Sequence, residues 1–420
     1  MGFRTIRGTR DILPDESYEW EFVENQIRAW FRRFNYREIQ TPAFEETTLF
    51  ARGIGQLTDI VSKEMYTFED RGGTSLTLKP EMTASVIRAF IQHHLGSSAP
   101  LTKLFYISPM FRQERPQAGR LRQFHQFGAE ALGSAHPEID AEVILLATSI
   151  YASFGLEKTV LKLTSVGCEK CRPGYKKILQ EALRSVVDRL TADSQRRVDE
   201  NPMRVLDSKE PQDRAATANV PLVKDHLCPE CSDHFRELQS LLTKTGVAFE
   251  IDGRLVRGLD YYTKTAFELV SGDLGSQDAL AGGGRYDLLA QELGGSPAPG
   301  IGFAAGIERL LVVLEKRSLF RGEAPHATVF VATLNGEARE DAFRLLQELR
   351  QSGISAEMDF HRRSLKAQMR EAGRQRADAV VLLGGDEWKT GLVALRDMRN
   401  GEQRQIPKEE LADSLLRMIG

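Results

Sequence analysis

The chain has 420 residues, of which 41% are hydrophobic and 27% charged, which is enough for two or three soluble domains. Its formal net charge of -3 argues against a protein that coats nucleic acid through bulk charge alone. The sequence contains no apolar run long enough to span a membrane, and its first residues lack the apolar core of a signal peptide. We therefore expect a soluble, cytoplasmic protein. Arg outnumbers Lys by 40 to 16, and Arg is the better residue for planar contacts with carboxylates and phosphates.

Helices and strands alternate in the first third of the chain. Apolar residues at three- and four-residue steps predict an amphipathic helix over 18–34, and a short strand at 37–42 ends at a proline. A strand over 74–79 leads into a helix over 84–91. Residues 104–132 predict a long antiparallel hairpin with a basic loop.

Residues 170 to about 240 are charged, helical and interrupted by prolines, which indicates an insertion. After it, the pattern predicts a strand over 255–270, a glycine turn at 282–286, and a glycine-rich strand that leads into an apolar helix over 300–314. Residues 323–325 read as a linker.

The last part of the chain alternates regularly between strand and helix. Strands are predicted at 328–333, 355–359 and 379–383, and helices at 337–351 and 365–376. Asn400-Gly401 is a strong hairpin signal, and 408–418 predict a final helix. This alternation is typical of a small α/β domain with a mostly parallel sheet.

Two segments carry the residue types needed to bind anions. Residues 112–122 contain four Arg and one Glu, and such a loop can bind phosphate or reach a polyanion. Residues 300–309 (GIGFAAGIER) combine small residues, which let a ligand approach the backbone, with an Arg at a helix start. Taken alone, each also fits a structural role, as a solvated hairpin loop or as a strand packed closely on a helix.

Taken together, three segments resemble the motifs of class II aminoacyl-tRNA synthetases. Residues 112–122 resemble motif 2, residues 300–309 resemble motif 3, and residues 41–44 (TPAF) resemble motif 1. Further segments narrow the resemblance to the histidyl-tRNA synthetase family and cover nearly the whole chain. They are 8–14 (GTRDILP), 79–83 (KPEMT), 112–116 (RQERP), 255–263 (LVRGLDYYT) and 281–287 (AGGGRYD).

The resemblance implies an α+β catalytic domain over 1–325, built on a six-stranded antiparallel sheet with flanking helices. It also implies a helical insertion at about 170–240, a C-terminal α/β anticodon-binding domain over 326–420, and a homodimer. The implied activity is that of a histidine–tRNA ligase. Such an enzyme uses ATP and Mg²⁺ to activate L-histidine as histidyl-adenylate, releases diphosphate, and transfers histidine to the 3′ end of tRNA(His).

The family motifs imply a role for each matching residue. Arg112 and Arg257 are expected on the α-phosphate as catalytic cations and near the histidine carboxylate. The histidine-binding residues are expected to be Glu81, Thr83, Arg112, Gln126, Glu130, Arg257, Tyr261, Tyr262 and Tyr286, with Glu130 and Tyr262 on the two imidazole nitrogens. The ATP-binding residues are expected to be Arg112, Glu114, Arg120, Phe124 and Arg309.

Two regions are candidates for tRNA binding. One is the 112–122 loop, through Arg115 and Gln117. The other contains Arg362, Lys366, Arg370 and Arg374, whose four-residue spacing predicts one basic face of a helix. A solvated helix face is the alternative interpretation.

The four cysteines form two CxxC pairs, Cys168 with Cys171 and Cys228 with Cys231, at the two ends of the insertion. Paired CxxC units are the usual arrangement of a structural zinc site. Zinc is not part of the family's chemistry, so the sequence leaves open both a structural zinc and four reduced thiols.

Two alternatives to the enzyme remain. One is a catalytically inactive paralogue, the regulatory subunit of ATP phosphoribosyltransferase, which lacks the anticodon-binding domain. The other is a synthetase-like module that regulates a kinase, although the sequence contains no kinase motif. His125 beside the site is a tempting general base, but a single His on a strand is more often structural.

Overall fold

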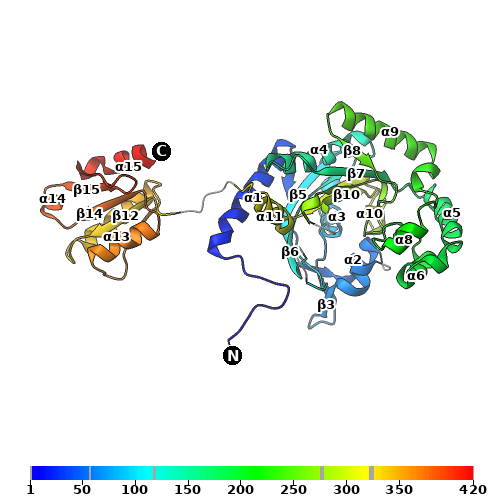
Figure 1. The fold of residues 1–420 in the computed structure, drawn as a ribbon, viewed down its shortest axis with the longest axis horizontal. Coiled ribbons are helices and arrows are strands. Elements are labelled where there is room, and N and C mark those ends of the chain that lie inside the picture. Colours follow the sequence, from blue (N-terminus) through cyan, green and yellow to red (C-terminus); the bar gives the residue numbers. More distant parts are fainter. Residues whose placement is uncertain (1, 56–57, 117–119, 275–278, 321–325, 420) are drawn as a thin grey trace. The chain divides into compact units, whose positions relative to one another are not determined.

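The computed structural model describes residues 2–55, 58–116, 120–274, 279–320 and 326–419. The chain divides into two compact units, Met1–Gly322 and Glu323–Gly420 (Figure 1). No helix within the described ranges has both the length and the apolar character needed to cross a membrane.

The first unit is built on an eight-stranded sheet with the order β1-β5-β6-β11-β10-β9-β7-β8. The six strands from β5 to β7 pair antiparallel, and β1 and β8 add one parallel strand at each edge. The predicted antiparallel sheet is therefore confirmed, with an added parallel strand on either side. The strands are β1 (Arg37–Glu38), β5 (Thr102–Phe111), β6 (Gln123–Leu132), β7 (Val160–Ser165), β8 (Phe249–Ile251), β9 (Thr263–Val270), β10 (Ala279–Arg285) and β11 (Gly300–Gly306).

The predicted hairpin over 104–132 is formed by β5 and β6. Their register runs from the pair Thr102–Leu132 to the pair Phe111–Gln123, so the basic loop joins their far ends. A smaller sheet of β2 (Phe44–Glu46), β4 (Ser75–Leu78) and β3 (Tyr66–Glu69) precedes this hairpin, with helices α2 (Thr47–Ile54) and α3 (Thr83–Gln92).

Helices α1 (Pro14–Arg33), α4 (Pro137–Ser153) and α11 (Ile307–Lys316) contribute to one apolar core with the large sheet (Figure 1). The apolar stripe of α1 faces inward, and Phe31 stacks on Phe105 of β5 with ring centroids 4.4 Å apart. Each fully buried side chain of this kind contributes about 1.5–3 kcal/mol of transfer free energy. The sheet is thereby fixed as a rigid support for the side chains on its other face.

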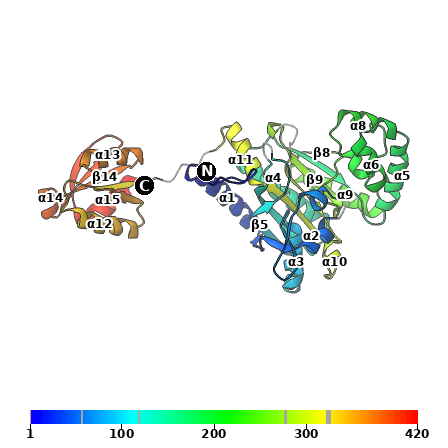
Figure 2. The same cartoon turned by 90° about the horizontal axis from the view of Figure 1, so that it is seen from below.

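The segment predicted as an insertion is helical. Figure 2 shows α5, α6, α8 and α9 grouped together beside the large sheet. The helices are α5 (Arg172–Arg184), α6 (Ala192–Glu200), α7 (Met203–Leu206), α8 (Pro211–Ala216) and α9 (Pro229–Lys244). Cys171 immediately precedes α5 and Cys228 immediately precedes α9.

Two local predictions for this unit are wrong. Residues 282–286 do not form a glycine turn, because 279–285 form β10, which pairs with β9 on one side and β11 on the other. The glycines are needed there for close approach, since a Cβ at Gly283 would lie 2.2 Å from the carbonyl oxygen of Gly302. The strand predicted over 255–270 begins only at Thr263, and residues 255–262 form an irregular segment with a bend at 258–259 and a turn at 260–261.

A buried polar network lies under the sheet beside α4. Asp140 forms an ion pair with the fully buried Arg285, and it also accepts hydrogen bonds from Thr265 Oγ1 at 2.6 Å and from His234 Nε2 at 2.8 Å. A buried charge is tolerated only when it is paired and hydrogen-bonded in this way. The network fixes the end of β10, from which Tyr286 projects.

The second unit has a five-stranded sheet with the order β13-β12-β14-β15-β16. Its strands are β12 (Val329–Thr333), β13 (Ala356–Met358), β14 (Ala379–Leu383), β15 (Leu392–Asp397) and β16 (Gln403–Pro407). Its helices are α12 (Arg339–Gln351), α13 (Leu365–Arg374), α14 (Asp386–Lys389) and α15 (Leu411–Ile419). β12 is parallel to both β13 and β14, and β15 and β16 form the hairpin predicted at Asn400-Gly401. The predicted α/β alternation is confirmed.

One detail of the basic helix face is wrong. α13 begins at Leu365, so Arg362 lies before the helix, in a left-handed backbone conformation with a φ of 56°. Lys366, Arg370 and Arg374 lie on α13 and are exposed. The Asp359 carboxylate accepts the backbone N–H of Arg363 at 2.7 Å. This contact lies just before α13, so the helical four-residue spacing does not extend back to Arg362.

Candidate active site

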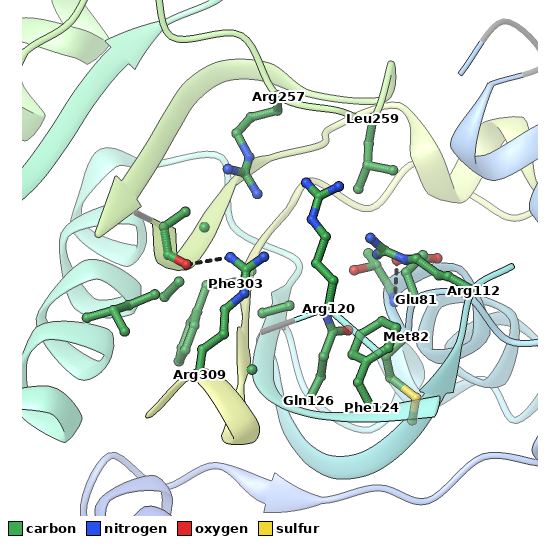
Figure 3. A pocket seen from close by; sticks show the side chains of 18 of the residues that line it. Glu81, Met82, Arg112, Arg120, Phe124, Gln126, Arg257, Leu259, Phe303 and Arg309 are labelled. Carbon is green, nitrogen blue, oxygen red and sulfur yellow. Dashed lines mark hydrogen bonds between the residues drawn. The ribbon is translucent and has the colours of Figure 1, made fainter. Parts of the chain in front are cut away.

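A cavity of about 260 Å³ lies in the first unit, and most of the predicted ligand-binding residues line it (Figure 3). Strands β6, β10 and β11 contribute to its walls, together with the loop after β5, the start of α3 and the start of α11. The predicted residues that line it are Glu81, Thr83, Arg112, Glu114, Arg120, Phe124, Gln126, Arg257, Tyr261, Tyr262, Tyr286 and Arg309. These residues come from segments up to 228 positions apart, between Glu81 and Arg309.

Arg112 follows directly after β5. Its Nε donates a hydrogen bond of 2.9 Å to the carbonyl oxygen of Pro80, and its guanidinium lies 5.2 Å from the centroid of the Phe124 ring. These two contacts orient the planar group at the cavity wall. From the same hairpin, Arg120 forms an ion pair of 3.2 Å with Glu114.

Arg309 lies in the first turn of α11, and its Nη1 donates to the carbonyl oxygen of Ala279 at 2.7 Å. Burial lowers the pKa of Arg309, and the neighbouring positive charges of Arg120 and Arg112 lower it further. Cations gathered in this way repel one another, so a bound polyanion would relieve the repulsion. Figure 3 shows Arg120, Arg257 and Arg309 directed toward the same part of the cavity.

Arg257 forms an ion pair with Glu268 of β9. Burial opposes the charge of Arg257, but the Glu268 carboxylate raises its pKa above the ordinary value. A Cβ at Gly282 would lie 2.3 Å from the Arg257 guanidinium, so the glycine leaves room for this side chain on the sheet. Arg257 Nε is buried and has no hydrogen-bond partner among the described residues.

Glu81 lies at the start of α3. Its carboxylate accepts the backbone N–H groups of Thr83 and Ala84, both at 2.8 Å, which suits a carboxylate at a helix N-terminus. Burial nevertheless raises the pKa of Glu81, although these hydrogen bonds lower it. Nearby on β6, Gln126 has a buried Oε1 without a partner in the described part of the chain.

Glu130 is not among the residues that line the cavity, and it is 1% exposed. Its carboxylate accepts the hydroxyl of Thr83 at 2.8 Å and also the hydroxyl of Tyr286. Burial raises the pKa of Glu130 to about 8, while these hydroxyls lower it. The Tyr261 ring lies 4.8 Å from that of Tyr262 and 5.7 Å from that of Tyr286, so the three aromatic rings form one wall of this part of the cavity.

Sequence reasoning missed several residues of this region. Glu308, beside Arg309, lines the cavity and accepts the backbone N–H of His125 at 2.9 Å. Its position inside the 300–309 motif was the available signal. Glu64 also lines the cavity, and the buried Tyr106 contributes to the electrostatic surroundings of Glu130, but neither lies in a motif that pointed to it.

His125 has a structural setting. Its Nδ1 lies 3.0 Å from Glu308 Oε1, and its ring packs edge-on against Trp20 of α1 with centroids 4.8 Å apart. These contacts fasten the end of β6 to two helices. The interpretation of His125 as a structural residue agrees with them.

Arg115, Arg362, Lys366, Arg370 and Arg374, predicted to bind tRNA, are not among the residues that line this cavity. Arg115 is exposed on the loop after β5, and Gln117 falls outside the described residues. On α13, Lys366 and Arg370 are exposed, and Arg374 forms an ion pair with Glu371. Arg362 is exposed just before this helix.

The four cysteines come together although about 60 residues separate the two pairs. Sγ of Cys168 lies 3.8 Å from Sγ of both Cys171 and Cys228, and Sγ of Cys171 lies 3.9 Å from Sγ of Cys231. All four sulfur atoms lie within 4.8 Å of one another, and the thiols are free. This is a donor set suited to a tetrahedral metal ion.

Comparisons with known proteins agree with the architecture and with the sequence motifs. A family model for histidyl-tRNA synthetase matches residues 8–310, and a model for an anticodon-binding domain matches residues 328–418. The chain is similar to the histidine–tRNA ligases of Chloroherpeton thalassium, at 50% identity over 98% of this chain and 97% of the relative, and of Halothermothrix orenii, at 46% identity over the full length of both. The crystal structure of apo S. aureus histidyl-tRNA synthetase matches with a TM-score of 0.84 at 36% identity, covering 99% of this chain and 100% of that one. The chain therefore belongs to the histidyl-tRNA synthetase family of class II aminoacyl-tRNA synthetases.

Proposed function

We propose that this chain activates L-histidine with ATP and transfers it to the 3′ end of tRNA(His). The observation that carries the proposal is the convergence of four arginines and three buried tyrosines on one cavity. The arginines supply the charge needed for a triphosphate, and the polar wall behind them supplies the selectivity for the amino acid.

In the first step, a carboxylate oxygen of histidine attacks the α-phosphorus of ATP. The new P–O bond forms as the bond to pyrophosphate breaks, giving histidyl-adenylate. Negative charge builds on the phosphate oxygens, so cations already in position lower the barrier. Arg112 and Arg257 are the proposed α-phosphate cations, and Arg120 and Arg309 are proposed to bind the pyrophosphate end. Phe124 stacks on adenine in this scheme, with Glu114 near its amino group.

The proposed imidazole readers are Glu130 and Tyr262, one on each ring nitrogen. Glu81, Thr83 and Gln126 are proposed to bind the α-amino group. A buried pocket that must hydrogen-bond both nitrogens leaves its own polar groups unpaired around an analogue that lacks them, and this discriminates strongly. Gln126 Oε1 and Arg257 Nε are buried and have no hydrogen-bond partner in the part of the chain that the structure describes, which supports the proposal that a polar ligand completes this wall.

A Mg²⁺ ion is the expected companion of the ATP phosphates. Mg²⁺ takes oxygen ligands, commonly one or two carboxylates together with substrate phosphates. Glu308 lines the cavity and fits this donor type. When bound, the ion would offset the charge on the leaving pyrophosphate.

The transfer step brings tRNA(His) to the adenylate. A terminal ribose hydroxyl attacks the carbonyl carbon, an ester bond forms, and AMP leaves. Arg115 and the surrounding loop are proposed to contact the acceptor end, and Arg362, Lys366, Arg370 and Arg374 the tRNA backbone. The cytoplasm is the proposed location, where this tRNA is used in translation.

A homodimer is also proposed, formed around the segment that resembles motif 1. A surface groove beside Thr41 and Pro42 and the exposed aromatic pair Phe44 and Phe68 support an interface there. Light scattering on the protein as it elutes from a size-exclusion column should give twice the chain mass of 47.1 kDa.

The inactive regulatory paralogue is disfavoured by the match of residues 328–418 to an anticodon-binding domain and by the retained arginines. Aminoacylation of tRNA(His) transcripts with and without an extra 5′ guanosine tests the proposal. Charging of a tRNA(His) transcript, and of no other tRNA, supports it. Failure to charge either transcript by folded protein would contradict it.

A further inference from the structure

The four-cysteine cluster has the dimensions of a tetrahedral zinc site. Zn–S bonds of about 2.3 Å in a tetrahedron place neighbouring sulfurs about 3.8 Å apart, whereas a disulfide needs about 2.0 Å. Three separate sulfur pairs lie at 3.8, 3.8 and 3.9 Å. Each CxxC pair contributes two of the four donors.

The backbone around the first pair is shaped for this arrangement. Gly167 has a φ of 71°, and a Cβ there would lie 2.9 Å from Cys171 Sγ. The backbone N–H of Cys168 points at Cys171 Sγ from 3.3 Å, which stabilises a thiolate. Because α5 begins after Cys171 and α9 after Cys228, the positive ends of both helices lie beside the sulfurs.

The surrounding side chains fit a negatively charged cluster. Four thiolates and one Zn²⁺ carry a net charge of −2, and the first CxxC pair encloses Lys170 and is followed directly by Arg172. Lys170 and Lys264 both contact Glu230, inside the second CxxC pair, at 3.2 Å. The ion pair between Lys170, inside the first CxxC pair, and Glu230, inside the second, therefore also joins the two pairs.

We propose that Cys168, Cys171, Cys228 and Cys231 bind a structural zinc ion, and that this ion fixes the backbone that carries Tyr262 in the candidate histidine pocket. The metal would join the two ends of the helical insertion. The metal site stands independently of the proposed activity, whereas its effect on histidine binding rests on that activity.

The connection runs through two hydrogen-bonded residues. Arg172 follows Cys171 directly, and its guanidinium donates to the carbonyl oxygens of Gly167, at 3.2 Å, and of Tyr262. Lys264, two residues after Tyr262, donates its backbone N–H to the same Gly167 carbonyl at 2.8 Å. Because Tyr262 lines the cavity, displacement of the first CxxC pair should shift this pocket wall.

Metal content and backbone protection test the proposal in the full-length protein. Protein purified without added metal should contain about one zinc per chain, and Co²⁺ exchanged into the site should give the absorption bands of tetrahedral thiolate coordination. Cys228→Ser should lose the metal, while Glu169→Gln, an exposed change within the first CxxC pair, should retain it. Removing zinc from the wild type with a chelator should raise hydrogen exchange in residues 261–264 and raise the KM for histidine more than the KM for ATP.

Several outcomes would overturn the inference. Protein without zinc that also fails to bind Co²⁺ contradicts the metal site, as does a disulfide between any two of these cysteines in protein freshly purified under reducing conditions. Zinc whose removal leaves exchange in 261–264 unchanged contradicts the link to Tyr262. The exchange measurement does not require activity, so a failure of the proposed enzyme function stays distinguishable from a failure of the metal site. The chelated wild type replaces Cys228→Ser where that variant does not fold.

Discussion

The hydroxyl of Thr83 donates a hydrogen bond of 2.8 Å to the carboxylate of Glu130, 47 positions further along the chain. Both groups are buried, and the contact joins the start of α3 to the last part of β6. It connects a residue proposed to bind the α-amino group of histidine with one proposed to read the imidazole. The two ends of the amino acid pocket are therefore positioned by one buried hydrogen-bond network.

The first prediction concerns Glu130 and pH. The pKa of Glu130 is about 8 in the folded protein and near 4.5 when exposed. Between these values the folded state binds a proton that the unfolded state has released, so the stability contribution of Glu130 falls as pH rises from about 4.5 to about 8. Glu130→Gln stays neutral and removes this pH dependence. The Tm difference, wild type minus variant, should become more negative from about pH 5 to about pH 8.

A Tm difference that is constant over this range would show that Glu130 does not titrate there. Thr83→Val is a useful companion variant because it removes one donor to the carboxylate and keeps the side-chain shape. Losing this hydrogen bond should raise the pKa of Glu130 further and move the transition to higher pH.

The second prediction concerns Arg257. Replacing it with Ala should slow adenylate formation about 10²- to 10³-fold, because a cation placed for transition-state charge is removed. Affinity for ATP should change much less, since Arg112, Arg120 and Arg309 remain. Single-turnover kinetics and equilibrium ATP binding separate the two quantities. Arg236→Ala, an exposed arginine on α9, is the control.

Equal losses in ATP binding and in the chemical step would contradict a transition-state role for Arg257. Circular dichroism on the variant is needed as well, because Arg257→Ala removes the cation that forms an ion pair with the Glu268 carboxylate.

The third prediction concerns Gly302 of β11. A Cβ there would lie 1.8 Å from Oε2 of Glu130 and 2.5 Å from the carbonyl oxygen of Ala129. Gly302→Ala should displace the Glu130 side chain and raise the KM for histidine about tenfold or more, since breaking a buried hydrogen bond costs about 1–3 kcal/mol. At Gly306 on the same strand, the nearest atom to a new Cβ is Arg309 Cγ, at 3.6 Å. Gly306→Ala should leave the histidine KM near that of the wild type. Similar histidine KM values for both variants would contradict the proposed position of the imidazole.

The fourth prediction concerns the second unit. Lys366→Ala combined with Arg370→Ala should raise the KM for tRNA. The slope of the logarithm of the tRNA binding constant against the logarithm of the salt concentration should become shallower by about 1 for each phosphate that the protein no longer neutralises. Histidine-dependent pyrophosphate exchange should stay unchanged, because these residues lie outside the catalytic unit. Arg344→Ala on α12 removes an exposed positive charge elsewhere and is the control. An unchanged tRNA KM in the double variant would assign Lys366 and Arg370 to an ordinary solvated helix face.

Much of the fold follows from local patterns in the sequence. The hairpin of β5 and β6, helix α1 and the alternation after residue 328 were predictable because hydrophobic periodicity there agrees with the tertiary structure. Strand β10 was not, because glycine runs favour turns locally. Only the close approach of β9 and β11 explains why Gly283 is needed within a strand.

The candidate site was predictable to a different extent. Family motifs identified many of the residues that line the cavity, but not Glu64 or Glu308, and the motifs say nothing about the partners of these residues. The pairing of Glu268 with Arg257 and the contact of Arg172 with Tyr262 join segments that only the folded chain brings together. The prediction that Arg362 lies on the basic helix face was wrong, because a four-residue spacing cannot show where a helix begins.

The most direct test of the proposed activity is histidine-dependent exchange of labelled pyrophosphate into ATP by the full-length protein. We expect exchange that requires histidine, that other amino acids do not support, and that falls about 10²-fold or more in Arg257→Ala. Folded protein that binds ATP and shows no exchange with histidine would contradict the proposed activity.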